Sequence, residues 1–191
     1  AVSAGPGSFT GLRIGSATAK GLGLALDLPI IEVPTVDGIA YNLFGTDRVV
    51  CPLMDAKRQQ VYTGLYTFDN DKMAVLSSQK AVSITRILEE INALGRPVIF
   101  NGDGVPVYKA IIEQDCRVPY CFAPASAAAQ RAGTLASLAA VYWKDQKEHV
   151  VSARDHQPDY LRLSQAEREL AAKQAAKAVA SGQDAGENKN E

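Results

Sequence analysis

A run of glycines near the start of the chain most constrains its fold. Six of the fifteen glycines fall within the first 23 residues, directly after a short apolar stretch that reads as the end of a buried strand. Glycine permits tight turns and close backbone approaches that other residues do not. A helix is expected from about Leu12 to Leu26, with Ser8 or Thr10 as its N-terminal cap. Strand, glycine-rich turn and helix in this order favour an α/β protein.

The rest of the chain alternates between strand-like and helix-like segments. Short runs rich in β-branched residues and bounded by turn residues predict strands over residues 30–33, 49–54, 60–68, 73–82 and 97–100. Helix caps and apolar residues at helical spacing predict helices over residues 12–26, 35–44, 84–94, 105–114 and 126–144. Ser126 is expected to cap the last of these helices, which is the longest. The segments up to residue 44 favour parallel packing, and the strands between residues 49 and 82 favour an antiparallel meander.

The glycine-rich turn has some features of an anion cradle, because free backbone N–H groups and a helix dipole both favour negative charge. It does not match a P-loop, since Thr10-Gly11-Leu12 stands where Gly-Lys-Ser/Thr is required. The spacing Gly5-x-Gly7-x-x-x-Gly11 also has one residue too many for the dinucleotide fingerprint. The alternative, a tight turn with close helix–sheet packing, is therefore favoured.

Within the predicted helix, Gly11, Gly15, Ala19 and Gly23 recur every four residues and so share one face. Each glycine in a helix costs up to about 1 kcal/mol relative to alanine, so this stripe of small residues needs a compensating reason. Close approach of another backbone would supply that reason. The approaching backbone can belong to the protein's own sheet or to a helix of a partner chain, and the sequence leaves both alternatives open.

Candidate catalytic and metal-binding residues are few. Ser8 lies one residue away from the position of a G-x-S-x-G nucleophile and reads as a helix cap. His149 and His156 lack metal-binding spacing and are expected at the surface. Asp55 and Asp103 each follow an apolar strand, where catalytic carboxylates often lie, but aspartate also favours turns. We therefore assign no catalytic residue, no metal ligand and no cofactor.

Composition excludes several other classes. A formal net charge of −1 gives no electrostatic footprint for binding nucleic acid directly. No apolar run approaches the roughly 18 residues of a membrane helix, and no secretory signal is visible. Three cysteines without a C-x-x-C pair disfavour a disulfide framework. A globular, cytoplasmic protein is expected.

Three segments, in the same order, resemble the TsaB (YeaZ) family of bacterial tRNA threonylcarbamoyladenosine biosynthesis. The first and most specific is the signature loop Gly5, Pro6, Gly7, Ser8, Phe9, Thr10 and Gly11, which continues into Leu12-Arg13-Ile14-Gly15. The second is Met54–Tyr62, which is similar to the family's Asp-Ala-Arg…Val-Tyr strand–turn–strand. The third is Pro158–Arg162, which is similar to its Pro-x-Tyr-Leu-Arg segment. The resemblance covers residues 1 to about 163.

The resemblance implies an α/β fold of the actin-like ATPase (hexokinase/Hsp70) type with two lobes. Family members begin with a Met-led strand, two further strands and a helix that this sequence does not show, so we expect an N-terminally truncated first lobe. We expect residues 1–46 to belong to the first lobe and residues 47–163 to form the second lobe plus a C-terminal helix that can pack back on the first. Residues 164–191 are rich in alanine and are expected to be largely disordered.

The resemblance also implies a function. Family members are non-catalytic scaffold subunits that pair with the TsaD transferase and, with the TsaE ATPase, support modification of adenosine 37 in tRNAs reading ANN codons. Homodimers are possible, and tRNA contact is expected only through the complex. The implied interface lies on the predicted first helix, at Leu12, Gly15, Ser16, Ala19, Lys20 and Gly23. The alternatives are a metal-dependent glycoprotease-like peptidase and an actin-like ATPase.

The ligand inventory predicts that the purified protein holds no stoichiometric divalent metal and cleaves no peptide. Two isolated histidines and three scattered cysteines do not provide the usual ligand spacings of a zinc site. Elemental analysis of the purified protein checks this. One tightly bound zinc or iron per chain would contradict it and revive the peptidase alternative.

Overall fold

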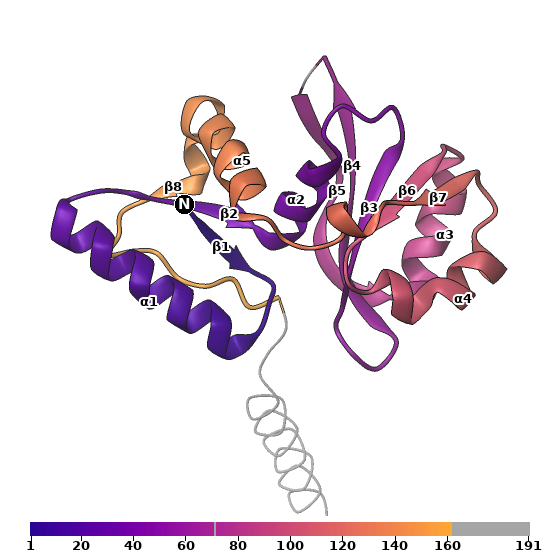
Figure 1. The fold of residues 1–191 in the computed structure, drawn as a ribbon, viewed down its shortest axis with the longest axis horizontal. Helices are drawn as coiled ribbons and strands as arrows, with labels where there is room; N and C mark the ends of the chain where they lie inside the picture. The colour runs from indigo at the N-terminus through magenta and orange to yellow at the C-terminus, as the bar shows by residue number, and fades with distance from the viewer. Residues whose placement is uncertain (71, 162–191) are drawn as a thin grey trace, which may run out of the picture. The chain divides into compact units, whose positions relative to one another are not determined.

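The computed structural model describes residues 1–70 and 72–161, all of which lie in one compact unit, residues 1–161. The alanine-rich segment predicted over residues 164–191 lies outside the described residues. The unit contains a three-stranded and a five-stranded β-sheet (Figure 1). Among the described residues, no helix is long and apolar enough to cross a membrane.

The smaller sheet has the strand order β1-β2-β8. Its strands are β1 (Val2–Gly5), β2 (Ile30–Pro34) and β8 (Val150–Val151). β1 and β2 are parallel and are connected by helix α1 (Phe9–Leu26), whereas β8 runs antiparallel to β2. The predicted first helix and the strand that follows it are therefore confirmed, and α1 begins three residues before its expected start because Ser8 is its cap.

The two faces of β2 carry different helices. Ile31 and Val33 point toward helix α5 (Ala132–Asp145) and join an apolar cluster with Leu138 and Tyr142. Ile30 and Glu32 point to the opposite face, where α1 lies. This alternation follows from the two-residue period of a strand. α1 and α5 are thus separated by the small sheet.

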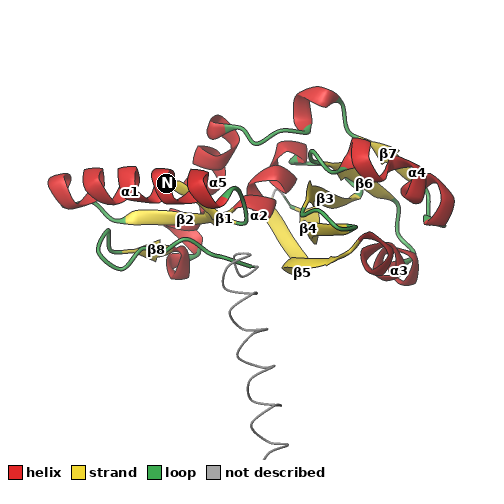
Figure 2. Cartoon of the chain, turned by 90° about the horizontal axis from the view of Figure 1, so that it is seen from below, coloured by secondary structure: helices red, strands yellow, loops and turns green. Residues whose placement is uncertain are grey.

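The larger sheet has the order β5-β4-β3-β6-β7. Its strands are β3 (Val49–Asp55), β4 (Gln60–Asp69), β5 (Lys72–Ser83), β6 (Val98–Asn101) and β7 (Tyr120–Phe122). β3, β4 and β5 form the predicted antiparallel meander, and β6 and β7 extend the sheet in parallel. Helices α3 (Ile84–Leu94) and α4 (Val105–Asp115) pack on one face and enclose the main apolar core (Figure 2).

Helix α2 (Thr35–Ala40), extended by a 3-10 turn over Tyr41–Leu43, packs against the opposite face of the larger sheet. Its buried carboxylate, Asp37, accepts a hydrogen bond from the hydroxyl of Tyr66 on β4 at 2.6 Å and one from Tyr142 on α5 at 2.9 Å. Burial raises the pKa of Asp37 above its usual 3.8, and the two tyrosine hydrogen bonds oppose that rise. This network connects the two sheets through one carboxylate.

The predicted start of the last helix is wrong. Ser126 lies in a 3-10 turn over Ala125–Ala127, and α5 begins only at Ala132. The side-chain amide of Asn42 donates hydrogen bonds to the carbonyl oxygens of Ala127 and Ala129. These two carbonyls therefore have a partner other than the backbone N–H groups of a helix. Among the described helices α1, with 18 residues, is longer than α5, with 14.

Two short strands escaped prediction. β7 and β8 contain three and two residues, too few for a periodic pattern to be read. α5 and β8 come late in the chain yet lie on the small sheet. The expected division of the chain near residue 46 stays a prediction, because residues 1–161 form a single compact unit.

The Asp37 network predicts that Tyr142→Phe lowers the free energy of unfolding by about 1–3 kcal/mol at neutral pH, the cost of leaving a buried polar group short of a partner. In the wild type the Tyr142 hydroxyl stabilises the ionised form of Asp37. Removing this hydroxyl therefore raises the pKa of Asp37 further. The gap between variant and wild type should therefore widen as the pH rises through the folded-state pKa of Asp37 in the wild type, which lies above 3.8, towards the higher pKa in the variant. Urea denaturation across this pH range measures the effect.

The matched control is Tyr62→Phe, on the same strand as Tyr66, because the hydroxyl of Tyr62 bonds to no described residue. A Tyr142→Phe variant that is no less stable than Tyr62→Phe at any pH would show that the network does not stabilise the fold.

Candidate functional site

The glycine-rich turn connects the end of β1 to the start of α1. Gly5 has a φ of +132°, and a Cβ there would collide with the carbonyl oxygen of Asp159. The backbone N–H of Asp159 donates to the carbonyl of Ala4 at 2.7 Å. Gly5 therefore allows a late segment of the chain to lie against the turn. The hydroxyl of Ser8 accepts a hydrogen bond from the backbone N–H of Gly11, so Ser8 is the N-terminal cap of α1. Ser8 and Thr10 were the two predicted caps.

We call the late segment, residues 153–160, the C-terminal strap. It runs along α1 (Figure 1) and is held by the side chains of that helix. The ammonium of Lys20 donates to the carbonyls of Arg154 and His156 at 2.8 and 2.9 Å. At Gly23, a Cβ would lie only 2.7 Å from the Cβ of Ala153. The strap thus fits into the space that the small residues of α1 leave.

His156 is the most buried polar contact of the strap, and the prediction that it lies at the surface is wrong. Its side chain is 0 % exposed. Its Nδ1 lies 2.6 Å from a carboxylate oxygen of Glu32, and its Nε2 lies 2.9 Å from the hydroxyl of Ser16. Since a carboxylate only accepts, Nδ1 donates to Glu32. The other histidine, His149, is partly buried and stacks on Tyr142 with ring centroids 4.2 Å apart.

The order Ser16, His156, Glu32 is that of a serine hydrolase triad, but accessibility argues against this chemistry. Ser16 is only 5 % exposed, and the imidazole beside it is fully buried. A substrate carbonyl cannot reach the serine oxygen without opening the contact between strap and helix. The geometry therefore supports a structural role, in which the three side chains fasten the strap to α1 and β2.

The structure places the six residues of the expected partner interface as follows. Leu12, Ser16 and Gly23 are buried, and Ser16, Lys20 and Gly23 contact the strap. Gly15 and Ala19 are half-buried, and a Cβ on Gly15 would meet only Val2, at 4.0 Å. These contacts favour the alternative in which the small-residue stripe packs against the protein itself. The assignment of these six residues to a partner interface stays a prediction.

The outer face of α1 is apolar and exposed. Four large side chains on the helix are 57–63 % exposed, namely Ile14, Leu22, Leu24 and Leu26. The helix contains no acidic residue, and its only cations are Arg13 and Lys20. These four side chains spread around the exposed part of the helix, and large exposed apolar residues make that part a candidate interaction surface. Sequence reasoning missed this surface because the small-residue stripe drew attention to the other side of the helix.

Asp55 and Asp103 lie together at the carboxyl ends of β3 and β6, but their partners are structural. Asp55 accepts from Lys57 at 2.6 Å and from Tyr108 at 3.0 Å, and its backbone N–H donates to Asp103. The hydrogen bond from Lys57 holds the pKa of Asp55 below its usual value. Lys57 and the two residues after it adopt left-handed backbone conformations. The two carboxylates therefore stabilise the tight turn after β3 through hydrogen bonds, which agrees with the prediction that these aspartates are turn residues.

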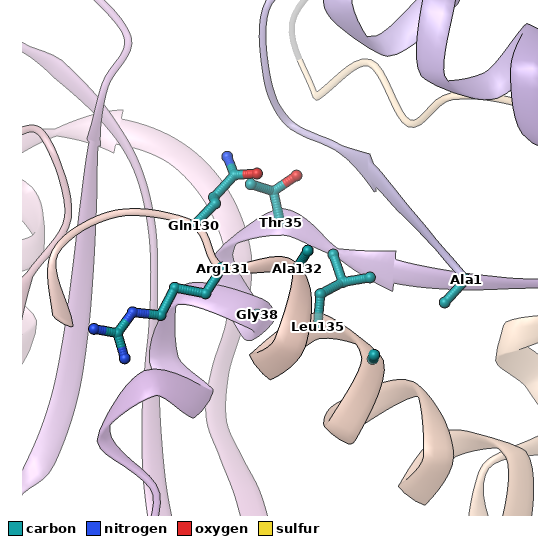
Figure 3. Close-up of a pocket in the computed structure, with 8 residues that line it drawn as sticks. Ala1, Thr35, Gly38, Gln130, Arg131, Ala132 and Leu135 are labelled. Carbon is teal, nitrogen blue, oxygen red and sulfur yellow. The ribbon is translucent and has the colours of Figure 1, made fainter. Parts of the chain in front are cut away.

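A cavity of about 490 Å³ lies near the start of α5 (Figure 3). Its lining comprises Ala1, Thr35, Gly38, Gln130, Arg131, Ala132, Leu135 and Ala136. The guanidinium of Arg131 turns away from Leu135 and donates to the carbonyl of Ser126. Thr35 is paired with Ser3 through their hydroxyls at 2.6 Å. None of these lining residues is an acid, a histidine or a cysteine, so this cavity offers no acid–base or nucleophilic group.

Groups suited to metal or thiol chemistry were also sought. Within residues 1–70 and 72–161, no three His, Cys, Asp or Glu side chains gather around a common point. Burial raises the pKa of the Cys51 thiol to about 12, which leaves it protonated and unreactive at neutral pH. The expected absence of a bound metal remains a prediction for elemental analysis.

Comparison with known proteins relates the chain to tRNA modification. The sequence model of the family described as "TsaD: tRNA N6-adenosine threonylcarbamoyltransferase" matches residues 1–170. A Bacillus subtilis (strain 168) relative, named tRNA threonylcarbamoyladenosine biosynthesis protein TsaB, is 34 % identical over 166 residues, which cover 87 % of this chain and 70 % of the relative. A relative of the same name from Buchnera aphidicola is 31 % identical over 107 residues, 54 % of this chain and 51 % of its own length.

A solved structure from Pseudomonas aeruginosa, described as an uncharacterized protein with similarity to peptidase YEAZ, superimposes with a TM-score of 0.66 at 28 % identity. The match covers 84 % of this chain and 71 % of that one. The α/β fold of the actin-like type, expected from the sequence, is thereby confirmed.

The contact between strap and helix predicts opposite effects for two neighbouring glycines. Gly23→Ala should destabilise the protein although alanine favours helices, because the new Cβ would lie 2.7 Å from Ala153 and 2.9 Å from the carbonyl of Leu28. Gly21→Ala meets nothing within 4 Å and should stabilise the protein by up to about 1 kcal/mol. Thermal unfolding of both variants measures the difference. Equal stabilisation by both would mean that the strap does not occupy this face.

Proposed function

Because the chain belongs to the TsaB (YeaZ) family, within the sequences matched by the TsaD model, we propose that it takes part in forming threonylcarbamoyladenosine in tRNA, as a non-catalytic subunit that binds the TsaD transferase. The involvement in this modification follows the name that the Bacillus subtilis and Buchnera relatives carry. The scaffold role is the finer part of the proposal.

The observation that carries this proposal is the exposed apolar outer face of α1. Burying one large aliphatic side chain stabilises an interface by about 1.5–3 kcal/mol relative to leaving it in water. Ile14, Leu22 and Leu26 on this face are each more than half exposed in the isolated chain. The inner face is already filled by the strap and the small sheet, so the outer face is the side of α1 left for a partner.

The candidate catalytic groups support a subunit without its own chemistry. Ser16 is buried behind His156, and Asp55 is paired with Lys57 and Tyr108. The 20 lysines and arginines of the chain are balanced by 21 aspartates and glutamates, so it has no net excess of the positive charge that dominates affinity for tRNA. Contact with tRNA is therefore assigned to the complex, in which the TsaE ATPase is the third protein component. A homodimer through the outer face of α1 would compete with TsaD for the same surface.

Reconstitution of tRNA threonylcarbamoylation with this chain, TsaD and TsaE tests the function. Omission of each component in turn should abolish or strongly reduce modification, and this chain alone should transfer nothing. Activity from this chain alone would make it an enzyme. Full activity without it would refute the scaffold role.

The interface itself predicts that Ile14→Glu weakens binding to TsaD at least about 30-fold, the loss typical of a hot-spot residue. Ile14 is 63 % exposed, so the variant should keep the circular dichroism spectrum and thermal stability of the wild type. Titration calorimetry with purified TsaD measures the affinity.

Val107→Glu is the matched control, because Val107 is 58 % exposed on α4, which packs on the other sheet. Equal affinities of the two variants for TsaD would remove α1 from the interface.

A further inference from the structure

An aromatic–guanidinium cluster lies at the first turns of α1. The rings of Phe9 and Tyr160 have centroids 5.5 Å apart, and the guanidinium carbon of Arg13 lies 4.2 Å above the ring of Phe9. The Nε of Arg13 donates to the hydroxyl of Tyr160 at 3.4 Å. All three side chains are exposed, although Tyr160 comes from the strap and the other two from α1. We call these three residues the Arg13 cluster.

The Arg13 cluster orients its guanidinium before any partner arrives. The guanidinium lies over the ring of Phe9, and its hydrogen bond to Tyr160 uses only Nε. The two terminal nitrogens bond to no described residue and remain available as a two-pronged donor. Lys20, the other cation of α1, is different because two backbone carbonyls of the strap already engage its ammonium. Arg13 is therefore the cation of this helix that is free to recognise an anion.

We propose that the Arg13 cluster is an anchor that receives a carboxylate side chain of the partner protein. The inference rests on the proposed function, since it assigns the TsaD-type transferase as that partner. Planar guanidinium and carboxylate groups form paired, charge-assisted hydrogen bonds of defined direction. Arginine and tyrosine are also the residue types enriched among those that dominate the energy of protein interfaces.

Charge favours a protein carboxylate over an RNA phosphate as the occupant. Binding to RNA draws on several cations together, whereas α1 offers one free cation and the whole chain carries a net charge of −1. The strap adds no excess of positive charge, since its one arginine, Arg154, is accompanied by Asp155 and Asp159. Ile14, the next residue along α1, is about 100° further around the helix and is also exposed. A partner that covers this turn of the helix would therefore meet both residues.

Tyr160 makes the anchor depend on the strap. The strap is fastened at His156 by Ser16 and Glu32, and at Asp159 by the backbone of Ala4. These contacts deliver the Tyr160 hydroxyl to Nε of Arg13. We assign Tyr160 as a positioning residue, which acts on the partner through the orientation of Arg13.

The test measures the affinity of the full chain for purified TsaD by titration calorimetry at low and moderate salt. Arg13→Gln should weaken binding about tenfold or more, as expected for loss of a charge-assisted pair. Arg13→Lys should weaken it nearly as much, because an ammonium keeps the charge but loses the fork and the stacking. Tyr160→Phe should cause a smaller loss that disappears in the Arg13→Gln background, since both changes act on one contact.

Arg117→Gln is the matched control, because it removes one exposed cation from a segment beside the larger sheet. If Arg13→Gln binds TsaD like Arg117→Gln while Ile14→Glu does not bind, the interface stands and the anchor is wrong. If Ile14→Glu also binds normally, the proposed function itself fails. If Arg13→Gln leaves TsaD binding intact but weakens binding of tRNA to the assembled complex, the occupant is a phosphate and the carboxylate proposal is overturned.

Discussion

A single buried carboxylate, Asp37, joins parts of the molecule that no continuous sheet connects. The small sheet with α1 and α5, and the larger sheet with α3 and α4, have separate apolar cores. α2 lies against both sheets, and the hydroxyls of Tyr66 and Tyr142 converge on its one acidic side chain. Burial of a charge is tolerated only where hydrogen bonds replace water, so the two tyrosines and the carboxylate depend on one another. The relative placement of α5 and β4 follows from that dependence.

The two faces of α1 divide structural and proposed binding roles between them. Apart from Leu12, the inner face consists of small or polar residues, because the backbone of the strap lies close against it. The outer face carries the large aliphatic residues that would ordinarily be turned inward. Ser16 and Lys20 of α1 and Glu32 of β2 provide hydrogen-bond partners for the polar groups of the strap on this inner side. The apolar side is then available for the proposed partner.

Elements governed by local patterns were predictable, and contacts between distant segments were not. Ser83 caps α3, and the apolar residues of that helix face the core at the expected spacing. A structural role was predicted for the glycine-rich turn, but the contact that the structure shows there, the passage of Asp159 over Gly5, involves residues more than 150 positions apart. His156 was misplaced for the same cause, since neither Ser16 nor Glu32 is near it in sequence. Serine is a common N-terminal cap, so Ser126 was a reasonable prediction. The side-chain amide of Asn42 instead binds the carbonyl oxygens of Ala127 and Ala129, which a helix starting at Ser126 would need.

The strap also bears on the order in which the chain can fold. Its hydrogen bonds to α1 join residues 134 to 147 positions apart, so the loop that must close is nearly the length of the whole unit. Contacts of such long range form late and slow the search for the native state. During synthesis α1 leaves the ribosome before residues 153–160 do, so the part of its inner face that the strap covers stays open to water until those residues have emerged. In that interval the nascent helix offers its apolar side to any chaperone or neighbouring chain without the rigid backing that the finished protein has.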